Sequence, residues 1–128
     1  MALTHSTAAK NAMLDAIDAL INTGSGTAQL KITTTGAGSV LATIDLDNPA
    51  FGSAASGAMV MAGLPQGDAS ADATGTAAEF HIYDRDATLV VSGTVTATGG
   101  GGDMTMPSVS ITASEPVDLN TFTYNAPA

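Results

Sequence analysis

The sequence predicts a mainly β protein, an antiparallel β-sandwich of about eight strands in a jelly-roll-like arrangement, preceded by one N-terminal amphipathic helix. Two observations support this prediction. Apolar residues recur with a helical period as far as Gly24, and they alternate with polar residues after it. Turn residues then separate the alternating runs about every 10 residues, which is typical of a sandwich or closed barrel. With 128 residues, we expect a single domain, 1–128, divided into a helix (1–24) and a sandwich (25–128).

The first segment is expected to form one helix that begins at an N-cap residue, Thr4, Ser6 or Thr7, and ends at a left-handed C-cap, Gly24. Apolar residues at i, i+4, i+7 and i+8 predict its buried face, which alanines widen: Met13, Ile17, Leu20 and Ile21, with Ala9, Ala12 and Ala16. Polar residues fill the remaining positions: Lys10, Asn11, Asp15 and Asp18. The helix should therefore pack along one side only.

Eight runs after Gly24 have the composition of strands: Thr27–Thr33, Ser39–Leu46, Ala58–Leu64, Ala77–Tyr83, Thr88–Val95, Asp103–Met106, Val109–Ala113 and Val117–Tyr124. Alternation predicts apolar residues that share a face within a strand: Val40, Ala42, Ile44 and Leu46; Phe80 and Ile82; Leu89 and Val91; Val109 and Ile111. The last run changes parity, so a bulge is expected at Asn120 or Thr121.

The connections between these strands differ in kind. Asp84–Ala87 is expected to form a short hairpin loop, whereas Gln66–Gly75 and Thr98–Gly102 are expected to be longer loops. Phe51 follows a turn and is expected to anchor it in the core. We expect the first and last strands to be sheet edges; they carry one lysine and few other charges, so a neighbour could pair with them.

The chain carries unusually little charge. Only 12% of its residues are Asp, Glu, Lys or Arg, and its polar positions are mostly Thr, Ser and Gly. The net charge is −9, and the only bases are Lys10, Lys31 and Arg85. This balance argues against binding a nucleic acid or an anionic membrane. With no cysteine there is no disulfide framework and no thiolate zinc site.

Met1–Ile21 has neither the basic start nor the apolar run of a secretory signal, so we expect synthesis in the cytoplasm.

The candidate sites have simple structural interpretations. Three aspartate pairs invite a calcium hypothesis, but their spacing is that of turns and strand faces: Asp45 and Asp47, Asp68 and Asp72, Asp84 and Asp86. A row of Glu79, His81 and Tyr83 could do acid–base chemistry, but it lacks a nucleophile nearby and is interpreted as a polar outer face. Gly99–Gly102 lacks the residues of a phosphate loop.

Methionine pairs favour core packing over an interface: Met59 with Met61, and Met104 with Met106. Because each candidate site has such a structural interpretation, we predict no catalytic, cofactor-binding or metal-binding residues.

Four segments, in order along most of the chain, resemble small proteins encoded in tailed-phage and prophage genomes: Leu3–Asn11, Ser70–Asp84, Val91–Val95 and Ser108–Ala113. The resemblance implies a virion structural protein of the head decoration (cement) type, with a β-sandwich or jelly-roll body. It carries no catalytic residues over to this chain.

The leading hypothesis is thus a non-enzymatic decoration protein that binds the assembled capsid of a phage. Its expected partners are the major capsid protein and further copies of itself, and its expected location is the capsid surface of the virion. Two alternatives remain: a tail or neck component, and an extracellular module that binds carbohydrate or a cation. The latter lacks tryptophan, the usual sugar-stacking residue.

Overall fold

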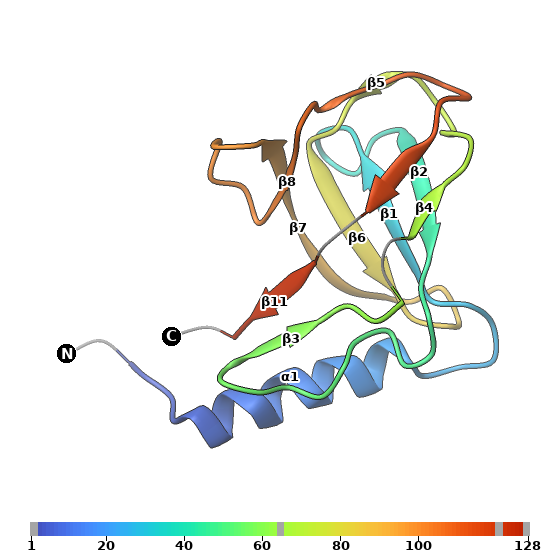
Figure 1. The fold of residues 1–128 in the computed structure, drawn as a ribbon. Helices are drawn as coiled ribbons and strands as arrows, with labels where there is room; N and C mark the ends of the chain where they lie inside the picture. Colours follow the sequence, from blue (N-terminus) through green and yellow to red (C-terminus); the bar gives the residue numbers. More distant parts are fainter. Residues whose placement is uncertain (1–2, 64–65, 120–121, 127–128) are drawn as a thin grey trace.

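The computed structural model describes residues 3–63, 66–119 and 122–126. It is mainly β, with one helix at the N-terminus, as the sequence predicted (Figure 1). The helix is α1 (Thr7–Ile21). The described residues form eleven strands rather than eight: β1 (Gln29–Thr33), β2 (Val40–Asp45), β3 (Ala58–Val60), β4 (Gln66–Asp68), β5 (Gly75–Thr76), β6 (Glu79–Tyr83), β7 (Leu89–Ala97), β8 (Met104–Met106), β9 (Ser110–Ile111), β10 (Val117–Leu119) and β11 (Thr123–Asn125).

Five strands form one sheet in the order β2-β1-β6-β7-β8, which curls around the core (Figure 1). The other strands pair as three short ribbons, β10 with β4, β11 with β3, and β5 with β9. Every ladder is antiparallel except that between β7 and β8. Three strands account for the higher count: β4 and β5 lie outside every predicted run, and the run predicted at Val117–Tyr124 is divided between β10 and β11.

Two predictions about the sheet are wrong. β1 lies in the middle of the sheet, between β2 and β6, and is not an edge. β8 runs parallel to β7, so the glycine-rich segment does not join an antiparallel hairpin. The chain instead doubles back after Ala97, with Gly99 and Gly101 at φ +89° and +81°. Because β8 is short and pairs only with Val95–Ala97, a small loop replaces the long crossover that parallel strands normally need.

The segment Gln66–Gly75, expected to be a loop, contains β4 and the first residue of β5. Its Asp72 N–H donates to the Leu41 carbonyl of β2 at 2.8 Å, so this segment covers the outer edge of β2. Residue 64, at the end of one predicted strand, and the bulge predicted at residues 120–121 lie outside the described residues.

The helix begins where the sequence indicated. The Ser6 side chain caps it by accepting a hydrogen bond from the Ala9 N–H at 3.1 Å. It ends earlier than predicted, at Ile21 with Asn22 as C-cap, although Gly24 does adopt a positive φ of +112°. Ser6 was one of the three predicted caps.

The buried face of α1 differs from the predicted one. Leu14 and Ile21 are buried and Ile17 packs against them, at the spacing i, i+3, i+7. Leu20, predicted to be buried, is 57% exposed, and Met13 is only partly buried. The helix is thus rotated from the prediction, and its alanines at 8, 12, 16 and 19 face solvent.

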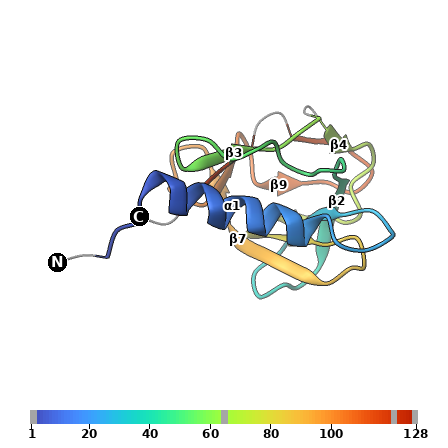
Figure 2. The same ribbon diagram turned by 90° about the horizontal axis from the view of Figure 1, so that it is seen from below.

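A polar stripe along α1 and its C-cap, formed by Asn11, Asp15, Asp18 and Asn22, explains this rotation. Residues 50–57, the strap, run alongside the helix in the opposite direction and lead into β3 (Figure 2). Four side chains of α1 and its C-cap accept hydrogen bonds from backbone N–H groups of the strap at 2.9–3.0 Å: Asn22 from Ala50, Asp18 from Phe51, Asp15 from Ala54 and Asn11 from Gly57. These side chains supply partners that the non-strand backbone of the strap lacks.

The core lies between the curled sheet, α1 and the ribbons. Phe51 is buried, as predicted, and its ring packs edge-on against those of Phe122 and Tyr124, with centroids 5.8 and 6.3 Å apart. Phe80 joins the cluster at 5.6 Å from Phe122. The predicted core role of the methionine pairs is confirmed: Met59, Met61 and Met104 are buried and Met106 packs against the core.

Candidate functional site

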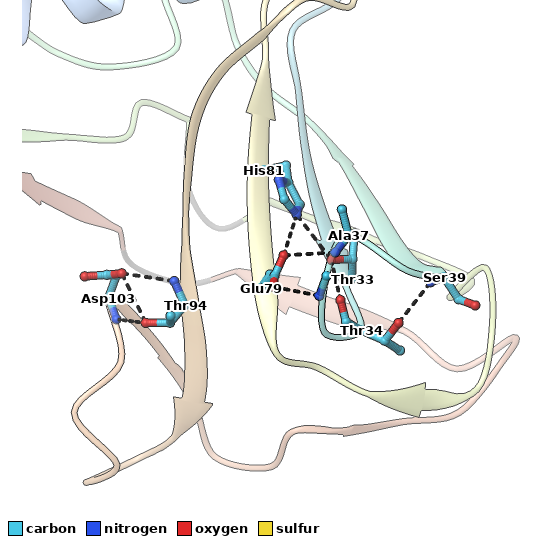
Figure 3. Close-up of polar contacts among 9 residues, drawn as sticks. Thr33, Thr34, Ala37, Ser39, Glu79, His81, Thr94 and Asp103 are labelled. Carbon is cyan, nitrogen blue, oxygen red and sulfur yellow. Dashed lines mark hydrogen bonds and ion pairs between the residues drawn. The ribbon is translucent and has the colours of Figure 1, made fainter.

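The predicted row on β6 forms a cluster with the turn that follows β1 (Figure 3). Glu79 Oε2 and Oε1 accept hydrogen bonds from the N–H groups of Gly36 and Ala37 at 2.8 and 3.1 Å. His81 Nε2 lies 3.2 Å from Glu79 Oε1 and 3.3 Å from Thr33 Oγ1. His81 is only 7% exposed, so its predicted place on a solvated face is wrong.

The geometry of this cluster favours a structural role. Thr33 Oγ1 donates its proton to the Thr34 carbonyl at 3.0 Å, so its oxygen accepts a hydrogen bond from His81 Nε2–H. The same Nε2–H faces Glu79. A general base needs an unprotonated nitrogen toward the nucleophile, whereas here the nitrogen that faces the hydroxyl carries the proton. The cluster therefore holds the turn to the sheet.

The electrostatics agree with that role. The N–H of Gly36, which has the largest effect, and the N–H of Ala37 stabilise the ionised carboxylate and lower the pKa of Glu79. Lys31 extends the row, with its Nζ 5.1 Å from the centre of the Tyr83 ring.

The aspartate pairs hold loops in place. Asp84 Oδ1 accepts from the N–H groups of Asp86 and Thr88 at 2.9 and 2.8 Å, which confirms the predicted turn chemistry. Asp68 Oδ2 accepts from the Thr43 N–H at 2.9 Å, and Asp72 Oδ2 from the Thr43 hydroxyl at 2.8 Å.

The remaining pair, Asp45 and Asp47, accepts hydrogen bonds from the amides of Gln29 and Gln66, each at 2.9 Å. Across residues 3–63, 66–119 and 122–126, no three acidic or histidine side chains come close enough to hold a metal ion.

The candidate binding site lies instead at the open edge of the sheet. The Val95 N–H donates to the Ala78 carbonyl, on the β6 side of β7, whereas the Thr94 N–H donates to Asp103 Oδ2 at 3.0 Å on the other side. Main-chain groups alternate along an antiparallel strand, so the N–H and C=O of Ser92 also point away from β6. Since β8 pairs only with Val95–Ala97, nothing in the described chain pairs with Ser92 at this edge.

A second open edge faces this one. The Phe122 carbonyl and the Ala126 N–H bond to the β3 side, each at 2.9 Å. By the same alternation, the main-chain groups of Thr123 and Asn125 point away from β3. Between the edges is a hollow of about 330 Å³, lined by Val91–Gly93, Phe122–Asn125, Phe80 and Asp103. This hollow and its two edges are called the β7–β11 groove below.

Gly93 is needed for the shape of this groove. A Cβ at that position would lie 2.6 Å from the Phe80 ring and 3.0 Å from Asp103 Oδ2. Asp103 also accepts from the Thr94 hydroxyl at 3.1 Å, and the Asp103 N–H donates back to that hydroxyl (Figure 3). Sequence reasoning did not identify these residues, although a lone glycine within a strand run indicates a close approach.

Comparisons of the chain with protein-family models, with curated proteins and with solved structures found no match. Within the described ranges, no helix is long and apolar enough to cross a membrane.

Proposed function

We propose that the chain is a non-enzymatic structural protein of a tailed-phage virion, a decoration (cement) protein that binds the assembled head shell. Its partners on this proposal are the major capsid protein and other copies of itself. It is made in the host cytoplasm and ends on the capsid surface. The resemblance of four segments to phage proteins supports the proposal, and the open β7–β11 groove is the structural observation that carries it.

The groove supports an assembly role because natural monomers usually protect sheet edges with charge, proline or a covering segment. Here no described segment pairs with the edge at Ser92, and the Asp103 carboxylate that lines the groove is bound to the neighbouring Thr94. Large apolar side chains are exposed as well, with Leu3 80% and Leu20 57% accessible. On a symmetric shell, modest contacts of this kind recur at every copy and stabilise the assembled state to which the protein binds.

We also propose a β-sandwich architecture for the chain. On this view the curled sheet forms one layer, and the three short ribbons form the second layer of a reduced, jelly-roll-like β-sandwich.

The test compares heads assembled with and without the protein. Heads lacking it should form but rupture at lower temperature or under osmotic shock, and added purified protein should restore their resistance. Binding should survive high salt, because the few bases of the chain leave little scope for ion pairs. Equal robustness of both preparations contradicts the proposal, and purification with tails assigns the protein to a tail or neck instead.

A second candidate is a carbohydrate-binding module, favoured by the mixed lining of the groove. The partly exposed Tyr124 offers a ring surface, and Ser92 and Asn125 offer hydrogen-bonding groups. Titration with oligosaccharides, followed by Tyr124 resonances in NMR spectra, tests it. Saturable shifts at millimolar sugar or below would favour this function over the capsid role.

A further inference from the structure

We propose that the β7–β11 groove binds the N-terminal arm, Leu3–Ser6, of a second copy, which adds to the edge of β7 at Ser92. Reciprocal exchange of arms would then give a two-fold symmetric dimer. The inference deepens the self-association part of the proposed function and rests on it.

The groove offers what an added strand requires. Ser92 presents a main-chain donor and acceptor on one wall, and Thr123 and Asn125 present theirs on the other. The hollow of about 330 Å³ gives an apolar side chain room against Phe80 and Phe122. Main-chain pairing would supply affinity, and the shape of the hollow would select the side chain that enters it.

The arm offers the matching partner. It precedes the helix, and Ser6 at its end has the extended backbone angles φ −66° and ψ 160°. Leu3 is 80% exposed, the largest value among the large apolar residues described. In Figures 1 and 2 the arm projects away from the body of the molecule. Four extended residues span about 13 Å, enough to lie along the edge at Ser92.

Charge also favours this pairing of surfaces. Two copies that each carry a net charge of −9 repel one another, so contact is least opposed where neither brings acidic groups together. The arm contains no acidic residue. Among the described residues that line the groove, only Asp103 has a carboxylate, and it is already hydrogen-bonded to the N–H and hydroxyl of Thr94.

Sedimentation equilibrium of the purified protein provides the first test. Leu3→Ser removes the apolar side chain of the arm, and Ser92→Pro removes the open-edge N–H without affecting the β6 ladder. Each should raise the dimer dissociation constant about tenfold or more. Leu20→Ser, a matched change of an exposed leucine on α1, should leave it unchanged.

Cross-linking provides the second test, because the natural chain contains no cysteine. A Leu3→Cys copy mixed with a mass-tagged Asn125→Cys copy should give the mixed disulfide dimer under mild oxidation. A Leu20→Cys copy in place of the first should not. Leu3, Leu20 and Asn125 are all exposed, so the three cysteine variants should fold.

Several results would overturn the inference. A protein that is monomeric at all accessible concentrations excludes arm exchange, while binding to heads can still be measured and the capsid proposal judged separately. A dimer weakened by Leu20→Ser but not by Leu3→Ser places the interface on α1. Saturation of the groove by an oligosaccharide without any dimer favours the carbohydrate-binding function.

Discussion

The outer edge of β2 is closed, whereas the edge of β7 near Ser92 is open. At β2, Asp68 accepts from the Thr43 N–H and the Leu41 carbonyl accepts from the Asp72 N–H, at 2.9 and 2.8 Å. At β7, Asp103 satisfies only Thr94. The chain thus closes one edge with its own segment, whereas no described residue pairs with the main chain of Ser92 at the other.

This difference shows how the chain uses its acidic residues. Asp68 covers an edge, Asp15 and Asp18 hold the strap, and Glu79 holds a turn, each by accepting from backbone N–H groups. The acidic charge therefore acts within the fold as well as on its surface. At Ser92, by contrast, no carboxylate of the described residues accepts a hydrogen bond from the backbone N–H.

Substitution of buried side chains at the two edges should give the largest effect. Leu41→Ala in β2 removes a fully buried side chain and should lower the free energy of unfolding by about 2–5 kcal/mol. Val91→Ala in β7, where the side chain is only partly buried, should cost clearly less. Urea unfolding followed by circular dichroism measures both, and equal losses would contradict the distinction between the edges.

Removal of the edge carboxylates should have an intermediate effect. Asp68→Ala leaves the partly buried Thr43 N–H without its acceptor and should cost about 1–3 kcal/mol. Asp103→Ala should cost less, because Thr94 is exposed and water can replace the carboxylate. The same unfolding experiment tests this order, with Asp45→Ala at an exposed position as control. A larger loss for Asp103→Ala would show that the β7 edge depends on its carboxylate.

A smaller effect is expected where Asp18 of α1 accepts a hydrogen bond from the backbone of the strap. Burial raises the pKa of Asp18 despite the hydrogen bond from Phe51, so ionisation of Asp18 disfavours the folded state. Its favourable contribution is fully present below the unfolded pKa and is lost as pH rises through the folded pKa.

Asp18→Asn keeps an acceptor for Phe51, as Asn22 does for Ala50, and should leave stability at pH 7 unchanged or slightly raised. Asp18→Ala, which removes the acceptor, should lower it. Thermal unfolding at pH 4 and pH 7 measures both variants; a large loss in Asp18→Asn at pH 7 would show that the charge itself is required.

The smallest effect is expected at Glu79. Its pKa is lowered in the folded state, so its contribution to stability is present above the unfolded pKa and is lost as pH falls through the folded pKa. Glu79→Gln should therefore be less stable than the natural chain at pH 7, with the gap narrowing in acid. Thermal unfolding across pH 3–7 checks this; a gap independent of pH would exclude the carboxylate as its cause.

Local signals in the sequence were sufficient for several features. Ser6 caps the helix, Phe51 anchors the core and Met59 fills it, because capping, turn chemistry and burial depend on near neighbours in the chain. The central position of β1 and the parallel pairing of β8 depend on partners distant in sequence or on a reversal of the chain, and alternation specifies neither.

The rotation of α1 and the position of the groove could not be predicted from the sequence. Leu14 and Leu20 both lie beside apolar residues, so two rotations of the helix were nearly equal by hydrophobic pattern alone. The polar stripe facing the strap decided between them. Similarly, the β7–β11 groove arises where two separate ladders end, so no single segment of the sequence predicts it.

The ladder between α1 and the strap also bears on how this chain can change in evolution. Asn11, Asp15, Asp18 and Asn22 meet their partners only while the helix keeps its phase. One inserted residue would rotate everything beyond it by about 100° and separate the later rungs from the strap. Seven inserted residues, about two turns, would restore the phase but move the later side chains about 10 Å along the axis, so a length change in this helix needs a matching length change in the strap.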